Sequence, residues 1–117
     1  MIKAIERLGF NSTYEYIKLL IEKELVKSGA NINTKGFKYV VYGVELLINY
    51  EYPRGKVMDL YNEIAKEYGV RPLNVERCIR YLKKGTKYEK YTTSMFLTII
   101  SLNVKEKILK ALHFDMG

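Results

Sequence analysis

The apolar residues of this chain recur every three to four positions over most of its length, which is the spacing of helices that bury one face. Ser12 and Glu15 match a capping box at the start of the first such stretch, and Gly29 is placed to end it. The apolar positions between these ends are Ile17, Leu20, Ile21 and Leu25. This pattern predicts a helix over about residues 12–28.

The stretch from Gly36 to Tyr50 is denser in apolar residues, which predicts a central helix that is buried on more than one side. Its valine-rich and tyrosine-rich start also suits a strand. No alternation with a period of two accompanies that start, so a helix is the better interpretation. The residues Pro53, Arg54 and Gly55 break the pattern.

The rest of the chain predicts further helices. Residues 56–68 form one apolar face, and Gly69 is suited to a left-handed cap at its end. Pro72 suits the first turn of a new helix that runs to about Lys84. Residues 92–102 and 104–113 form one or two more helices, with any division at Asn103. We therefore expect an all-α fold, a compact bundle of about six helices, in one domain over residues 1–117.

The connection between the two helices at Gly69 is only three or four residues long, as in a helix-turn-helix. That motif needs a small residue where its helices touch, a glycine in the turn and apolar residues that hold the second helix down. These requirements are met in order by Ala65, Gly69, Val70, Val75 and Cys78. The sequence therefore predicts a helix-turn-helix over about residues 56–84.

The second helix of this motif predicts base contacts. If Val75, Cys78, Ile79 and Leu82 face the core, helical geometry places Leu73, Glu76, Arg77, Arg80 and Lys84 outside. Arginine matches the O6 and N7 atoms of guanine, and glutamate accepts from N4 of cytosine. We therefore expect Glu76, Arg77 and Arg80 to read base pairs in the major groove. The competing interpretation is a simple intrahelical ion pair between Glu76 and Arg80.

Positive charge is concentrated around this helix. The formal net charge of the chain is +7, and residues 71–90 carry seven Lys and Arg against two Glu, a net of +5. Concentrated positive charge indicates a polyanionic partner. The side chains expected to contact DNA phosphates are Arg71, Asn74, Lys83, Lys84 and Lys87.

The composition gives little support for disulfide bonds, zinc sites or membrane spans. Cys78 is the only cysteine and His113 the only histidine, so neither a disulfide framework nor a zinc site is expected. No apolar run approaches the roughly 20 residues that span a bilayer. We expect a soluble cytoplasmic protein that is not an enzyme and has no cofactor.

Several short motifs stand in the order found in a known family. They are Lys35-Gly36-Phe37, Leu60-Tyr61, Ile64-Ala65-Lys66, Val75-Glu76-Arg77 and Ile79-Arg80. The set resembles the C-terminal DNA-binding effector domain of the sporulation initiation response regulator of spore-forming Firmicutes. The resemblance covers about residues 28–84, with a weaker likeness over 93–108. It implies a six-helix bundle in which Glu76, Arg77 and Arg80 face the bases of a short promoter box.

The chain also departs from that family. The family's regulators carry an N-terminal phosphoacceptor receiver domain, for which 117 residues leave no room, so control by phosphorylation is not expected. The segment 83–91 is shorter than the resemblance leads one to expect. The family's contacts with neighbouring subunits or polymerase are therefore not carried over to this segment. Residues 1–27 either pack on the bundle or mediate dimerisation, and packing is the favoured interpretation.

Three functions follow from these features. The main hypothesis is a sequence-specific double-stranded DNA-binding transcription regulator. Its further partners are a second copy, bound as a dimer or side by side on repeated sites, and RNA polymerase or a related regulator. The second is a helical protein-interaction module that pairs with a full-length sporulation-type regulator and modulates it. The third is an RNA binder that stacks bases on Tyr81, Tyr88 and Tyr91, although such tyrosines more often pack at a core edge.

Overall fold

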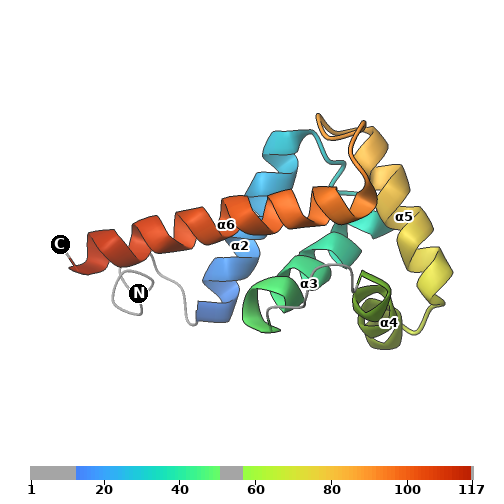
Figure 1. Cartoon of the computed structure of the whole chain (residues 1–117), viewed down its shortest axis with the longest axis horizontal. Helices are drawn as coiled ribbons and strands as arrows, with labels where there is room; N and C mark the ends of the chain where they lie inside the picture. Colours follow the sequence, from blue (N-terminus) through green and yellow to red (C-terminus); the bar gives the residue numbers. More distant parts are fainter. Residues whose placement is uncertain (1–12, 51–56, 117) are drawn as a thin grey trace.

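A computed structural model describes residues 13–50 and 57–116 of the chain. These residues form five α-helices and no strand. The helices are α2 (Thr13–Ser28), α3 (Lys35–Tyr50), α4 (Val57–Tyr68), α5 (Pro72–Lys84) and α6 (Thr93–Met116) (Figure 1). The all-α prediction is confirmed. The predicted capping residue Ser12 and the predicted break at residues 53–55 lie outside the described residues.

Two of the predicted helix ends are glycines in the left-handed region. Gly29 has φ 102° and Gly69 has φ 65°, and residues with a side chain rarely adopt such values. The amide after each glycine closes the helix: Ala30 N–H donates to Leu25 O, and Val70 N–H donates to Ala65 O, both at 3.0 Å. The predicted stops after α2 and α4 are therefore confirmed.

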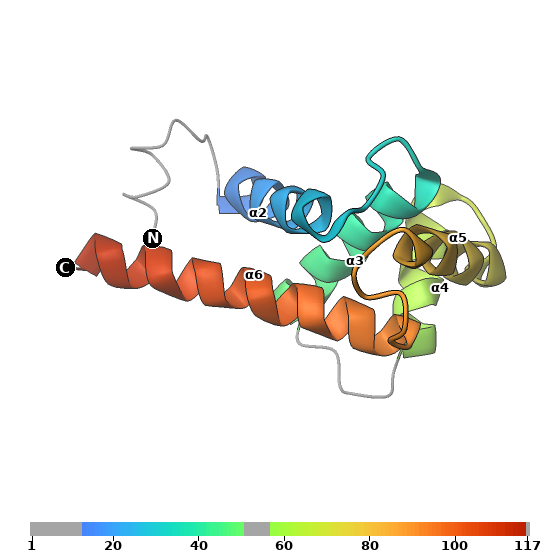
Figure 2. The same ribbon diagram turned by 90° about the horizontal axis from the view of Figure 1, so that it is seen from above.

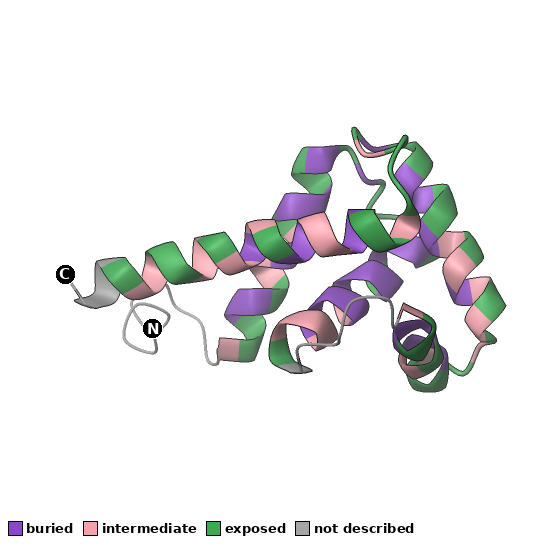
Figure 3. Cartoon of the chain, in the orientation of Figure 1, coloured by how far each residue is buried: buried purple, intermediate pink, exposed green. Residues whose placement is uncertain are grey.

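The central helix of the bundle is α3. It contacts each of the other four described helices, and it is a helix throughout, not a strand at its start. Its residues Val40 and Val44 are fully buried. Figure 3 shows that the buried residues lie on the sides of the helices that face one another. The other fully buried core residues include Ile21, Leu25, Ile64, Val75, Ile79, Phe96 and Ile100.

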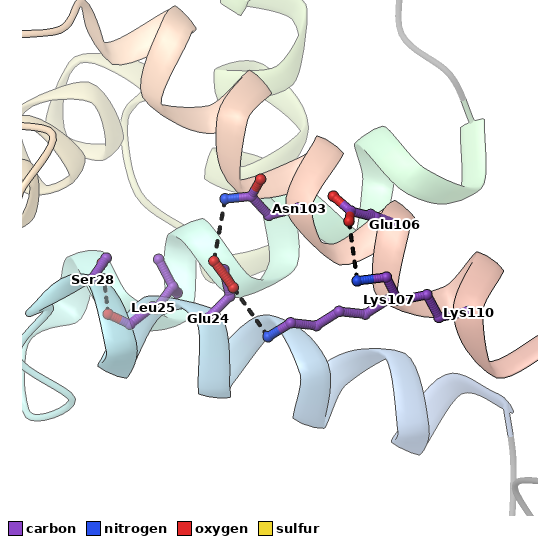
Figure 4. Close-up of polar contacts among 7 residues, drawn as sticks. All are labelled: Glu24, Leu25, Ser28, Asn103, Glu106, Lys107 and Lys110. Carbon is purple, nitrogen blue, oxygen red and sulfur yellow. Dashed lines mark hydrogen bonds and ion pairs between the residues drawn. The ribbon is translucent and has the colours of Figure 1, made fainter.

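Of the one or two helices expected near the C-terminus, the structure has one, the long helix α6. Asn103 lies inside it, and its amide Nδ2 donates to Oε1 of Glu24 on α2 at 3.2 Å (Figure 4). The ammonium of Lys107, one turn further along α6, lies 3.2 Å from Oε2 of the same carboxylate. Glu24 is only 4% exposed, so both of its oxygens are paired where water is scarce. This contact joins α2 to the middle of α6, and residues 13–27 pack on the bundle.

The C-terminal part of α6 extends past α2, as the views in Figures 1 and 2 both show. At its other end α6 lies beside α3 and α5. The α4–α5 pair therefore occupies one end of the molecule, and the projecting end of α6 occupies the other.

A close backbone contact between two helices is made by Gly36, in the first turn of α3. A Cβ atom at this position would clash with the carbonyl oxygen of Cys78 on α5, and would lie 2.9 Å from its carbonyl carbon. It would also lie 3.1 Å from Cβ of Leu82. Because backbone atoms cannot move aside as a side chain can, only glycine allows α3 and α5 to approach this closely.

We expect Gly36→Ala to destabilise the fold by roughly 1–3 kcal/mol, because α3 and α5 must separate to admit the methyl group. The matched control is Gly43→Ala, also in α3. There the new Cβ would come closest to Cδ1 of Ile64, at 2.9 Å, which is the far end of a flexible side chain, and its next neighbours lie at 3.8 Å. Chemical denaturation of both variants measures the difference. Equal unfolding free energies would show that the Gly36 contact places no constraint on the fold.

A buried carboxylate on α3 makes the free energy of unfolding of the chain depend on pH. Glu45 is 5% exposed, and burial raises its pKa. The hydrogen bond from Tyr14 and the charge of Lys18 act in the opposite direction, while the charge of Glu22 adds to the increase. The same hydrogen bond is the main reason that the pKa of Tyr14 is raised to about 12. Glu45 thus takes up a proton more readily in the folded chain than in the unfolded chain.

This shift gives a signed prediction for Glu45→Gln. The contribution of Glu45 is fully present below its ordinary pKa of 4.5 and is lost as the pH rises through the raised folded value. Glutamine can still accept from Tyr14 and carries no charge. We therefore expect the variant to be more stable than the wild type at pH 7, with the difference shrinking towards pH 4. Melting curves across this range test it, and a difference independent of pH would refute it.

Candidate nucleic-acid interface

The α4 and α5 helices are joined by three residues, Gly69, Val70 and Arg71. In Figure 1 α4 is seen nearly end-on while α5 runs in the plane of the view, so the two helices cross steeply. The residues expected at this junction come together as predicted: Ala65 and Val75 are buried, and Val70 and Cys78 pack against the core. Nothing lies within 4 Å of a Cβ placed at Gly69, so this glycine is required by its backbone angle and not by space.

The helix α5 has a buried side and an exposed side. Its buried residues Val75, Ile79 and Leu82 are at most 3% exposed and hold the helix against the core. The exposed residues on the other side are Leu73, Arg77, Arg80, Tyr81 and Lys84. The predicted division of α5 into an inner and an outer face is therefore confirmed for these positions. It places two guanidinium groups and an ammonium on one side of a well-anchored helix.

Glu76 lies at the edge of this exposed side. Its side chain is 25% exposed, and its Oε1 lies 3.6 Å from a guanidinium nitrogen of Arg80, one turn away. It also faces α4: burial raises the pKa of Tyr61 to about 12, with the charge of Glu76 as the second cause. The ion pair that competes with base reading is thus present in the free chain. Because the Arg80 side chain is 54% exposed, such a pair is weak and exchangeable.

Four of the five side chains expected to contact phosphates are accessible to some degree. Arg71, Lys84 and Lys87 are exposed, and Asn74 is partly buried, with its Oδ1 3.7 Å from Sγ of Cys78. Lys83 differs from the expectation. It is only 7% exposed, and its ammonium donates to the carbonyl oxygen of Glu89 at 2.6 Å. Since this ammonium is used inside the chain, we leave Lys83 out of the interface.

The loop after α5, residues 85–92, is held by a dense set of hydrogen bonds. Thr86 Oγ1 donates to Lys83 O at 2.8 Å and accepts from the amide of Tyr88 at 3.1 Å. The amide of Lys87 donates to Ser28 O at the end of α2, at 3.0 Å. These bonds fix the loop to two helices, so Lys87 is presented from an ordered backbone.

The tyrosines of this loop do not form an open stacking platform. Tyr88 is partly buried, and its ring centroid lies 5.9 Å from that of Phe96, which is fully buried. Its other neighbours are Tyr91, with centroids 5.8 Å apart, and the ammonium of Lys87, 5.3 Å from its ring. Tyr91, and Tyr81 on the preceding helix α5, are exposed. Of the two interpretations that the sequence allows, base stacking and packing at the core edge, Tyr88 fits the second.

Comparison with protein families assigns this fold. Residues 21–113 match the model described as "Sporulation initiation factor Spo0A C terminal". The chain belongs to this family. The Spo0A C-terminal domain is a DNA-binding effector domain of transcription and is not an enzyme. The match extends well beyond residues 28–84, where the resemblance was clearest, and includes all of α3, α4 and α5. No curated protein and no solved structure matches the chain.

Two features of this Spo0A-type domain were not found from the sequence. The sequence marks Gly36 only as part of a short motif and as the start of an apolar stretch, whereas its contact with Cys78 positions α5. The hydrogen bond from Lys83 to Glu89 O was not predicted either. The one sequence feature that pointed to burial of Lys83 is its position directly after the apolar Leu82. Within the described residues no group of potential metal ligands occurs, and no helix there is long and apolar enough to cross a membrane.

The different environments of Lys83 and Lys84 give a stability test. Lys83→Met removes a charged hydrogen bond and leaves Glu89 O without its donor, so we expect a loss of roughly 1–3 kcal/mol. Lys84→Met, at an exposed position next to it, is expected to change stability by less than about 0.5 kcal/mol. Thermal unfolding compares the two variants. If both behave like the wild type, the bond between Lys83 and Glu89 does not stabilise the loop.

Proposed function

We propose that this chain is a sequence-specific transcription regulator that binds double-stranded DNA in the cytoplasm. In this proposal α4 and α5 form a helix-turn-helix, and α5 is the recognition helix that enters the major groove. The observation that carries it is the exposed side of α5, where Arg77, Arg80 and Lys84 project from a helix anchored by three buried residues. Family membership supplies the DNA-binding class independently.

The chemistry of that side supports base reading. Each guanidinium offers two parallel donors to O6 and N7 of guanine, and Glu76 offers an acceptor to N4 of cytosine. On binding, Arg80 exchanges its ion pair with Glu76 for a base edge. This exchange costs little because the Arg80 side chain is 54% exposed and lies 3.6 Å from the carboxylate. Glu76 then stays close to the groove without an internal partner on α5.

Phosphate contacts would set the position of α5 without reading sequence. Arg71 at the turn, Asn74 in the first turns of α5, and Lys84 and Lys87 at its far end are spaced along the helix. They bracket the base-reading residues on both sides. Such bracketing fixes the register of a recognition helix in the groove.

A second candidate function is supported by α6. Met95, Leu102 and Leu109 are 49%, 53% and 64% exposed, and they recur at intervals of seven residues along one helix. An exposed apolar row of this kind suits contact with another helix. The corresponding function is a module that pairs with a full-length regulator of the same family and modulates it. It predicts a stable heterocomplex and DNA binding that is weak and indifferent to sequence.

The test of the main proposal is selection of binding sites from random duplexes, followed by affinity measurements on the selected site. We expect Arg77→Ala and Arg80→Ala each to cost roughly 1–3 kcal/mol and to relax discrimination at one base pair. Lys84→Ala is the control: it should weaken selected and random duplexes by the same factor. Retention of full site preference by Arg77→Ala would refute the base-reading assignment.

A further inference from the structure

Two further cations lie beside the recognition helix, on a different element. Lys35 and Lys38 are in the first turn of α3, and both are exposed. Neither forms an ion pair with any carboxylate in the described part of the chain. Gly36, between them, is the residue that touches the backbone of α5. Their backbone positions relative to α5 are therefore fixed by a close backbone contact.

Residues on and just before the first turn of α3 lie near both ends of α5. Towards its N-terminus, the ammonium of Lys38 lies 5.2 Å from the ring centroid of Tyr68, the last residue of α4. Towards its C-terminus, Asn31 and Thr34 from the loop before α3 line an open pocket of about 340 Å³, together with Tyr81 and Lys84. We call the exposed residues Asn31, Lys35, Lys38 and Tyr81 the α3 flank.

The other side of α5 has the opposite charge character. Glu76 lies on that side, near Tyr61 of α4. Helix α4 carries three carboxylates, from Asp59, Glu63 and Glu67, against the single cation Lys66. A polyanion beside α4 would meet net repulsion, whereas one beside the first turn of α3 meets two ammonium groups that form no ion pair within the described residues.

We propose that the α3 flank binds the phosphates of one DNA strand while α5 occupies the major groove. An α-helix with its side chains is about 10–12 Å wide and fills a groove about 12 Å wide, so exposed side chains that flank the helix lie next to a strand backbone. Lys35 and Lys38 contact consecutive phosphates on that strand, and the amide nitrogen of Asn31 adds a neutral donor. This inference rests on the proposed function.

The experiment measures how the affinity for the selected duplex changes with salt concentration. Each phosphate neutralised contributes about −0.9 to the slope of log affinity against log salt. For Lys35→Ala/Lys38→Ala we expect the slope to become shallower by about 1.8, with equal weakening on selected and random duplexes. The matched control is Lys23→Ala/Lys66→Ala, which removes two exposed lysines from α2 and α4 and the same total charge. Its slope should equal that of the wild type.

The outcomes separate this inference from the function on which it rests. Restoration of the wild-type slope by Lys35→Arg/Lys38→Arg supports the α3 flank. A wild-type slope for Lys35→Ala/Lys38→Ala, with site preference still dependent on Arg77, overturns the α3 flank and leaves the proposed function standing. Equal loss in the two alanine pairs also overturns it, because net charge and not location would then decide. Absence of any site preference in the wild type refutes the proposed function, and this inference with it.

Discussion

The position of α5 depends on one steric constraint, the approach of the α3 backbone to the Cys78 carbonyl at Gly36. Contacts between apolar side chains tolerate small shifts, but two backbones in contact do not. α3 itself touches every other described helix, so this contact ties the exposed arginines to the whole core. The α4–α5 turn sets the crossing of those two helices, and Gly36 sets how deeply α5 sits. The proposed function needs both, because the reading of base edges requires side chains to be held in place within a fraction of an ångström.

Much of this fold could be predicted because it follows from local rules. The helical period divides α5 correctly, since Val75, Ile79 and Leu82 all lie on one side at that spacing. The stops at Gly29 and Gly69 are readable because few residues other than glycine adopt a positive φ at low cost. The outward placement of Arg77 and Arg80 then follows by geometry. The helix faces and helix ends could be predicted because residues close together in the sequence determine them.

The features that escaped prediction depend on partners far away in the sequence or on exact spacing. The sequence left open whether α6 divides at Asn103. The helix continues there, and the Asn103 amide donates to Glu24, 79 positions earlier. Lys83 and Lys84 look alike in the sequence, and only the folded loop shows that Glu89 O captures one of them. The need for glycine at position 36 becomes visible only when α5 is placed against it. The spacing of apolar residues along a helix does not predict contacts of this kind.

The bond between Lys83 and Glu89 has a consequence for how charge is counted in DNA-binding chains. A cation gains affinity for DNA by displacing condensed counterions, and it can do so only if its head group reaches a phosphate. The ammonium of Lys83 is already committed to a backbone carbonyl inside the chain. The net charge of the 71–90 segment, taken from composition, therefore overstates the number of ions that binding can release. In such a domain one lysine holds the loop in place from inside, and its ammonium displaces no counterion from DNA.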